Sequence, residues 1–210
     1  LYIMDVASRH LQQVTHGGGL EIGAKFFRDG RGILVSRTGG RESEIVLMNL
    51  DGVVLRKITS SVGIIDVSPD WSPDYTRIVF CSNRGGGPQI YTMQADGSEI
   101  KRISFVASNY CTSPKWSPKG DRIAFVCRAE GGFQIFTVNP DGSDPLQLTS
   151  FGDNEDPSWS PNGQFIAFAT TFGKGRVTNI AMMTLEGANI QQLTFSKGGD
   201  SEPAWGPLAS

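Results

Sequence analysis

Histidine and cysteine often carry enzyme chemistry, and this chain has few of either. Of its 210 residues only His10 and His16 are histidines. Nucleophilic catalysis needs a base held beside a nucleophile, and no Gly-x-Ser-x-Gly sequence is present to supply one. A zinc ion needs three or four converging nitrogen or sulfur ligands, which two histidines and three scattered cysteines do not suggest. We therefore predict surface roles for both histidines and no catalytic residues.

Charged side chains offer a different chemistry, the recognition of a partner. One set is acidic and polar, with only Lys25, Lys115 and Lys197 as bases nearby, and comprises Glu21, Asp66, Asn109, Tyr110, Asp153, Asn154, Glu155, Asp156, Asp200 and Glu202. A second set is basic and lies among Gly-rich stretches: Arg41, Arg84, Arg128, Lys174 and Arg176. An acidic mouth with a basic rim can steer a partner of complementary charge.

Two other interpretations of these residues stay open. Carboxylates could hold a calcium ion through their oxygens, although their spacing matches no EF-hand loop, so we expect no cofactor beyond that possible ion. Asp and Ser are also common in turns because they bond to their own backbone, so part of the acidic set would only shape loops. Arg84 would then brace the edge of a sheet.

A sequence repeat defines the elements that position these residues. Each copy has an aromatic residue, a Ser-Pro turn, β-rich runs, an Asp-Gly or Glu-Gly pair, and a closing Leu/Ile-Thr/Ser. The aromatic positions are Phe26, Trp71, Trp116, Trp159 and Trp205, spaced 45, 45, 43 and 46 residues apart. A period of about 45 residues predicts an all-β propeller with four-stranded antiparallel blades, and we assign the aromatic residues to packing between strands.

Four strands can be predicted in each copy. The first ends on the aromatic residue, at 67–72, 112–117 and 155–160. The second is a dense apolar run such as 77–80, the third alternates as at 89–93, and the fourth is short and polar as at 101–104. Because the strands run up and down, the loops that join copies and the loops between second and third strands emerge on one face. The acidic set lies in the loops that join successive copies, and the basic set lies in the loops between second and third strands.

The order of strands along the chain leaves the number of blades open. Third and fourth strands come first (1–15), four complete copies follow, and a first strand stands alone at 202–206. That last strand could close a five-bladed ring with residues 1–15. We favour part of a six-bladed ring with the first strands absent, since the chain starts abruptly at Leu1.

Composition excludes several classes of function. The net charge of −2 argues against nucleic-acid binding, and no run of 18 apolar residues could span a membrane. Cys81, Cys111 and Cys127 lack Cys-x-x-Cys spacing, with two on expected strands of different copies and one in a loop. We expect them to be small buried side chains rather than a disulfide framework.

The repeat Trp-Ser-Pro-Asp/Asn-Gly, followed by Ile-Ala-Phe, Ile-Tyr, Asp-Gly and Leu-Thr, covers essentially the whole chain. Together with the end segments 1–15 and 202–208, it resembles the C-terminal propeller of the TolB family. The resemblance implies that residues 1–210 are a propeller fragment that an N-terminal α/β domain would precede.

For function, the resemblance implies a periplasmic, non-enzymatic propeller of the Tol-Pal system. Such propellers bind the peptidoglycan-associated lipoprotein Pal, support outer-membrane integrity and cell division, and are exploited by colicins during protein transport. Two other classes remain: the propeller of a prolyl-oligopeptidase-like hydrolase, and a propeller lyase or sugar-binding module. The lyase would want His and Lys in the channel, which this sequence scarcely offers.

Overall fold

The protein folds entirely from β-strands in the described part of the chain, residues 1–171 and 177–206 of a computed structural model. A hairpin of β1 (Tyr2–Met4) and β2 (Leu11–Gln13) comes first. Four antiparallel four-stranded sheets follow, here called blades 1 to 4. Blade 1 consists of β3 (Leu20–Phe26), β4 (Gly32–Gly39), β5 (Glu42–Asn49) and β6 (Val54–Lys57), and blade 2 of β7 (Asp66–Trp71), β8 (Arg77–Ser82), β9 (Gln89–Gln94) and β10 (Lys101–Arg102). Blade 3 consists of β11 (Cys111–Trp116), β12 (Ile123–Ala129), β13 (Gly132–Val138) and β14 (Leu146–Gln147), and blade 4 of β15 (Asn154–Trp159), β16 (Phe165–Thr170), β17 (Asn179–Thr184) and β18 (Gln191–Gln192).

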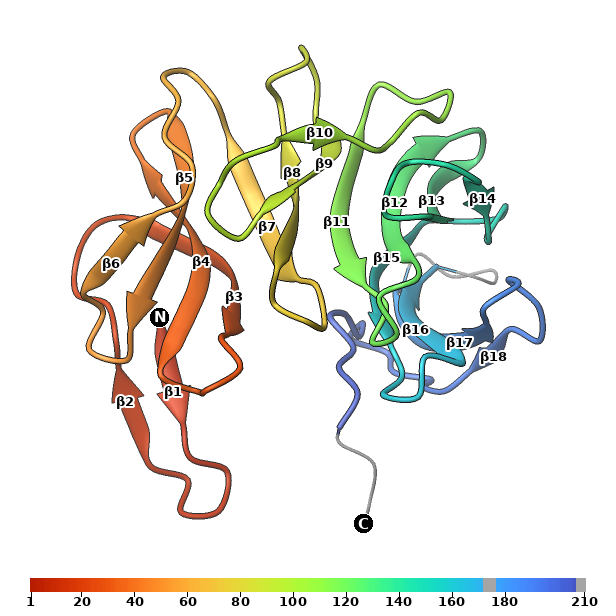
Figure 1. The fold of residues 1–210 in the computed structure, drawn as a ribbon. Helices are drawn as coiled ribbons and strands as arrows, with labels where there is room; N and C mark the ends of the chain where they lie inside the picture. Colours follow the sequence, from red (N-terminus) through yellow and green to blue (C-terminus); the bar gives the residue numbers. More distant parts are fainter. Residues whose placement is uncertain (172–176, 207–210) are drawn as a thin grey trace.

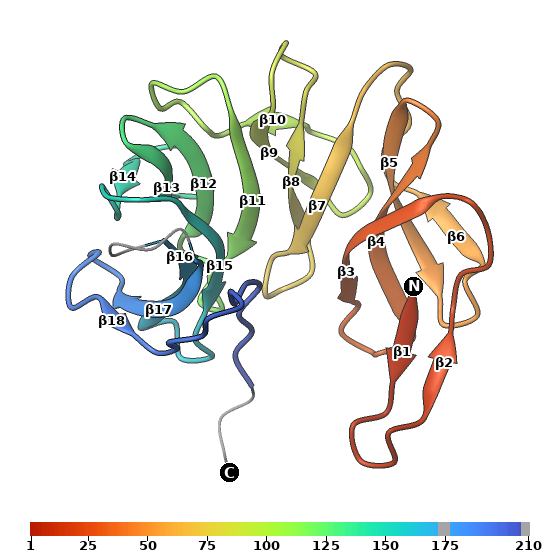
Figure 2. The same ribbon diagram turned by 180° about the vertical axis from the view of Figure 1, so that it is seen from behind.

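The blades succeed one another along an arc (Figure 1). Seen from behind, the β1–β2 hairpin lies at one end of the arc and the last described residues at the other (Figure 2). Each sheet pairs its strands in sequence order. The predicted all-β propeller with four-stranded antiparallel blades is therefore confirmed, and the eroded repeat around Phe26 builds a complete blade.

The hydrophobic core lies between blades rather than within one layer. Leu34 and Ile45 of blade 1 pack with Ile78 and Phe80 of blade 2. Equivalent clusters join blade 2 to blade 3 and blade 3 to blade 4, and a smaller one joins the hairpin to blade 1. A blade therefore buries its faces only against its neighbours, which is the energetic reason for the repeat.

The closing Thr or Ser of each copy ties the outer strand of a blade to its third strand. The hydroxyl oxygen of Thr59 accepts a hydrogen bond of 2.9 Å from the backbone N–H of Ile45. The same bond recurs, at 2.9–3.0 Å, from Ile90 to Ser104, from Ile135 to Thr149 and from Ile180 to Thr194. The hydroxyl supplies the acceptor at the point where the short outer strand has ended, so the motif has a structural cause.

The Asp-Gly turns explain the other repeated residue, because each turn lies against the preceding blade. Gly97 has a φ of +88°, and a Cβ built on it would lie 2.3 Å from the carbonyl oxygen of Ile58. A Cβ on Gly52 or Gly187 would likewise clash with the carbonyl oxygen of Val14 or Leu148, whereas a Cβ on Gly142 would have slightly more room beside Ile103. Only glycine fits both the positive φ and this close approach.

Two details of the predicted strand pattern need correction. The first strands begin and end one residue earlier than predicted, for example Asp66–Trp71 instead of 67–72. The predicted lone strand at 202–206 does not form, and β1 pairs only with β2 among the described residues. The described residues therefore contain no three-stranded closing blade of residues 202–206 with β1 and β2. The number of blades stays a prediction.

We expect Gly97→Ala to destabilise the protein more than Gly63→Ala. Both glycines have positive φ, +88° and +73°, but a methyl group added at Gly63 would meet nothing within 4 Å, whereas one at Gly97 would meet Ile58. Strain at φ should cost about 1–2 kcal/mol in each variant, and the steric clash at Gly97 about 1–3 kcal/mol more. Denaturant unfolding measures both, and equal losses would contradict the role of blade contact.

Candidate functional site

The inner strand of every blade contains a β-bulge at the same position. The register of β3, β7, β11 and β15 against the next strand shifts between residues 22 and 25, 67 and 70, 112 and 115, and 155 and 158. One residue in each bulge has a positive φ: Gly23, Ser68, Ser113 and Asp156, and Glu202 shares this conformation in the last described segment. Bulges bend a strand and redirect its side chains.

These bulges line one cavity of about 530 Å³, here called the axial cavity. Residues of β3, β7, β11, β15 and 202–204 surround it. Its charged side chains are Lys25, Asp70, Lys115, Asp156 and Glu202. The predicted set included Asp156 and Glu202 but placed both in loops. Asp156 lies instead in the bulge of β15, whereas Glu202 lies outside any strand, and both line the axial cavity.

The carboxylate of Asp70 contacts groups of both neighbouring inner strands in the axial cavity. The ammonium of Lys25 lies 3.4 Å from one of its carboxylate oxygens, and the backbone N–H of Trp116 donates a hydrogen bond of 2.8 Å to the other. Burial lowers the pKa of Lys115, and the nearby ammonium of Lys25 lowers it further, while Asp70 and Asp156 oppose this. Lys25 is therefore ion-paired with Asp70, whereas Lys115 is attracted by both Asp70 and Asp156 without an ion pair among the described residues.

A second group of predicted residues meets at the loop face of blades 3 and 4. The backbone N–H of Arg128 donates to the carbonyl oxygen of Tyr110, and the Tyr110 ring lies 5.8 Å from that of Phe133. A carboxylate oxygen of Asp153 accepts a 2.9 Å hydrogen bond from the N–H of Phe133. We call Tyr110, Arg128, Phe133, Asp153 and Glu155 the mouth patch. Asn109 is exposed beside it.

Electrostatics at the mouth patch centre on Glu155. Partial burial raises the pKa of Glu155, and the neighbouring carboxylates of Asp156 and Asp153 raise it further. Three acids therefore crowd together with no arginine or lysine paired to them in the described residues. Such a cluster favours the approach of a basic group.

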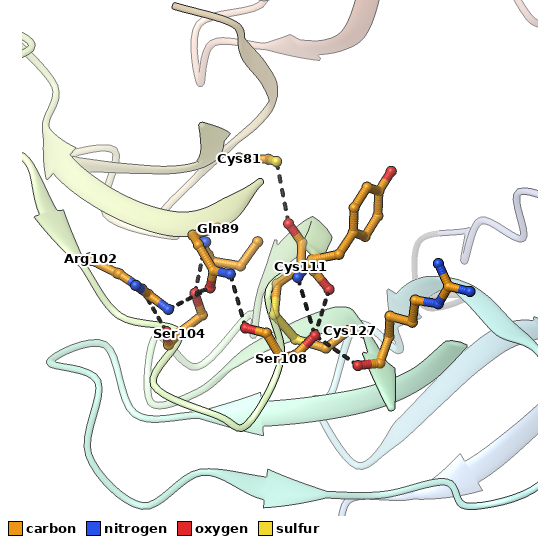
Figure 3. Close-up of a disulfide and its surroundings, with 10 residues drawn as sticks. Cys81, Gln89, Arg102, Ser104, Ser108, Cys111 and Cys127 are labelled. Atoms are coloured by element: carbon orange, nitrogen blue, oxygen red, sulfur yellow. Dashed lines mark hydrogen bonds between the residues drawn. A yellow bond between two sulfur atoms is a disulfide. The ribbon is translucent and has the colours of Figure 1, made fainter. Parts of the chain in front are cut away.

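A disulfide between Cys111 and Cys127 anchors the loop that carries Tyr110, which corrects the prediction of three isolated thiols (Figure 3). Cys111 begins β11 rather than lying in a loop, and it faces Cys127 directly across the β11–β12 pair. Ser108 reinforces the loop, since its hydroxyl donates to the carbonyl oxygens of Tyr110 and Arg128 at 3.0 and 2.7 Å. Cys81 is the buried free thiol that was predicted.

Three predicted residues act inside the fold instead of at its surface. Asp66 is 1% exposed and binds the guanidinium of Arg84 at 2.9 and 3.0 Å. Arg84 also lies over the rings of Phe80 and Tyr91, so it braces blade 2. Asn154 is also 1% exposed, and its amide bonds to Phe151 and Gln134.

The remaining predicted residues are dispersed. Glu21, in β3, accepts a hydrogen bond from the hydroxyl of Thr15. Asp200 donates its backbone N–H to Thr178, and one of its carboxylate oxygens is buried without a partner in the described chain. Arg176 lies outside the described residues. His10 and His16 are exposed, in the β1–β2 turn and the β2–β3 loop.

The structure groups no three His, Cys, Asp or Glu side chains in a metal-binding arrangement within 1–171 and 177–206. Calcium therefore stays a prediction from sequence. No helix in the same residues is long and apolar enough to cross a bilayer.

Sequence reasoning missed Phe133 and the charge pattern of the axial cavity. Lys25, Asp70 and Lys115 each stand one residue before the blade aromatic, so the 45-residue repeat was the available signal. Their approach could not be predicted without the bulges, which decide the face of the strand on which they lie.

Comparison with known proteins gives one family. The family model described as the TolB beta propeller domain matches residues 1–209. The Tol-Pal system protein TolB of Bordetella pertussis is 49% identical over 157 residues, which are 75% of this chain and 35% of that protein. The crystal structure of TolB from Acinetobacter baumannii superposes with a TM-score of 0.82 at 28% identity, over 97% of this chain and 50% of that one.

The fold alone is shared more widely. An oligogalacturonate lyase structure in complex with manganese has a TM-score of 0.68 at 14% identity, covering 92% of this chain and 58% of that chain. The match thus covers 35% of the Bordetella pertussis protein and 50% of the Acinetobacter baumannii one, so this chain spans only part of the length of these relatives.

We expect loss of the disulfide to destabilise the fold. Cys111 and Cys127 are 16 residues apart, and closing a loop of that size contributes about 3 kcal/mol. Denaturant unfolding of a Cys111→Ala/Cys127→Ala variant should show a loss of about 2–4 kcal/mol. A reducing agent should lower the stability of the parent protein but leave the double variant unchanged. A loss on reduction of the variant would contradict this.

We expect Glu155→Gln to raise the free energy of unfolding at pH 7 by a few tenths of a kcal/mol. The pKa of Glu155 in the fold lies above its ordinary 4.5, so the ionised side chain costs stability above the folded-state pKa. That cost disappears as the pH falls below 4.5, and the two proteins should then converge. Asp96→Asn is the control of opposite sign, because hydrogen bonds from Ser98 lower the pKa of Asp96.

Proposed function

The chain belongs to the TolB β-propeller domain family, and from that premise we propose that it is a non-enzymatic protein-binding propeller of the Tol-Pal system. Its partner in this proposal is a Pal-like peptidoglycan-associated lipoprotein, bound in the periplasm. The interaction would support outer-membrane integrity and cell division.

The mouth patch is the observation that carries the proposal. Tyr110 is 40% exposed although it belongs to a loop fixed by a disulfide and by Ser108, and Phe151 beside the patch is 71% exposed. Exposed aromatic residues on a rigid loop, flanked by the carboxylates of Asp153 and Glu155, match the composition of protein-binding hot spots. Arg128 supplies the basic part of the same surface.

Three further observations support a periplasmic binder over an enzyme. Disulfides persist in oxidising compartments such as the bacterial periplasm, so the Cys111–Cys127 bond fits that location. Burial raises the pKa of the Cys81 thiol to about 11, which leaves it protonated and unreactive at neutral pH. Neither histidine lines the axial cavity.

We expect alanine substitutions in the loop face to weaken binding of a Pal-like lipoprotein. Asp153→Ala, Glu155→Ala and Asp200→Ala together should lower affinity at least about tenfold, and Tyr110→Ala should do so alone because it removes a central aromatic anchor. Calorimetric titration with the purified lipoprotein measures the change.

Asp96→Ala and Asp141→Ala are matched controls on the opposite face. Among the described residues, both carboxylates accept hydrogen bonds from Ser98 or Ser143 alone, within their own turns, so affinity should stay nearly unchanged while stability falls. Loss of affinity in these controls with none in the loop-face variants would overturn the assignment of the binding face.

A further inference from the structure

The last two tryptophans of the repeat show which acceptor the indole N–H takes in this fold. The indole N–H of Trp159 donates a 3.1 Å hydrogen bond to the main-chain carbonyl of Lys115, and that of Trp205 donates a 3.0 Å bond to the carbonyl of Ser158. Both acceptors lie on the preceding inner strand. An indole has one donor and no acceptor, so a single peptide carbonyl satisfies it.

Trp71 and Trp116, at the same position of blades 2 and 3, lack such an acceptor. They are 8% and 7% exposed, and neither indole nitrogen has a hydrogen-bond partner within residues 1–171 and 177–206. Buried polar groups are nearly always paired, because an unpaired donor has lost its bond to water without gaining another. Two such donors in neighbouring blades therefore point to an acceptor that the described residues do not supply.

One cavity of about 370 Å³, here called the aromatic cavity, is lined by both indole rings. It lies where the inner strands β3, β7 and β11 end, so it is at the opposite end of β11 from Tyr110 and the mouth patch. The apolar part of its wall consists of Phe26, Trp71, Pro73, Tyr75 and Trp116. Four aromatic rings and a proline make this wall suited to a flat, apolar group.

The charged groups of the aromatic cavity are already paired with each other. The ammonium of Lys25 lies 3.4 Å from one carboxylate oxygen of Asp70, and the other oxygen accepts the backbone N–H of Trp116 at 2.8 Å. The hydroxyl of Ser72 donates to Asp74 at 2.6 Å. With its charges paired, the cavity offers two neutral indole donors, which suit a neutral carbonyl oxygen rather than an ion.

We propose that the aromatic cavity binds a proline-containing segment of a partner protein in the polyproline II conformation. Such a segment has no internal hydrogen bonds, so its carbonyl oxygens are free to accept from an indole N–H. Aromatic-lined grooves recognise proline-rich peptides because this conformation is already formed before binding. The carbonyls of the segment take the role that the preceding strand has at Trp159 and Trp205. The proposal does not depend on the Pal-like partner or on the mouth patch.

Binding requires a small movement of the wall. Both indole nitrogens are shielded from water in the free protein, so a carbonyl oxygen reaches them only when a neighbouring ring shifts. Phe26 is 53% exposed and is the most exposed of the four rings. We expect its ring to move aside as the segment enters.

Nuclear magnetic resonance of the indole N–H groups tests the site directly, because the chain has four tryptophans. Titration of the full chain with a capped triproline peptide should shift the indole signals of Trp71 and Trp116. The signals of Trp159 and Trp205 should stay in place, since their N–H groups are already bonded inside the fold. A capped trialanine peptide has the same carbonyls without the rings and the fixed backbone, and it should bind at least about tenfold more weakly.

Substitutions to phenylalanine remove the donor and keep an aromatic ring. Trp71→Phe and Trp116→Phe should each weaken triproline binding about fivefold, the usual effect of losing one neutral hydrogen bond. Trp159→Phe is the matched control, because it removes an indole whose acceptor is Lys115 of the fold itself. This control should lower the stability of the protein and leave its affinity for triproline unchanged.

The proposal is overturned if triproline at about 1 mM, the weak end of specific recognition, shifts the signal of neither Trp71 nor Trp116. It is also overturned if Trp71→Phe and Trp116→Phe, shown to be folded by circular dichroism, bind triproline as the parent does. Equal binding of triproline and trialanine would contradict the assignment of a proline-containing segment.

Discussion

The contact between each Asp-Gly or Glu-Gly turn and the outer edge of the preceding blade, or of the β1–β2 hairpin, is the constraint on which the molecule depends. Gly97 approaches Ile58 so closely that no side chain fits, and Gly52 and Gly187 make the same approach to Val14 and Leu148. This contact limits how closely neighbouring blades can approach each other, and the apolar clusters fill the space between them.

Regular spacing allows residues far apart in the chain to share one site. Lys25, Asp70 and Lys115 are separated by 45 residues at each step, yet the bulges of β3, β7 and β11 bring them to one cavity. The mouth patch forms in the same way from the β10–β11 and β14–β15 connections and the neighbouring ends of β12, β13 and β15. A rigid scaffold thus offers two distinct chemical surfaces, a cavity lined by lysines and carboxylates and a patch of aromatic rings with acids.

The disulfide gives the mouth patch its rigidity. Cys111 and Cys127 join the first two strands of blade 3 at the end where Tyr110 and Arg128 emerge, and Ser108 bonds to the carbonyl groups of both residues. A loop held in this way loses little conformational entropy when a partner binds. The fold therefore places a covalent restraint beside the exposed ring of Tyr110.

The sequence by itself determined the blade pattern, because its causes are local or strictly periodic: Pro and Gly at turns, apolar runs in strands, and the Thr or Ser that caps each outer strand. Tertiary structure alone decided which polar side chains stay exposed to solvent and which are bound inside the fold. Asp66 and Asn154 resemble surface residues in sequence but are buried by Arg84, Gln134 and Phe151. It also decided the pairing of Cys111 with Cys127 and the absence of a strand at 202–206, since both depend on the partner strand that packing supplies.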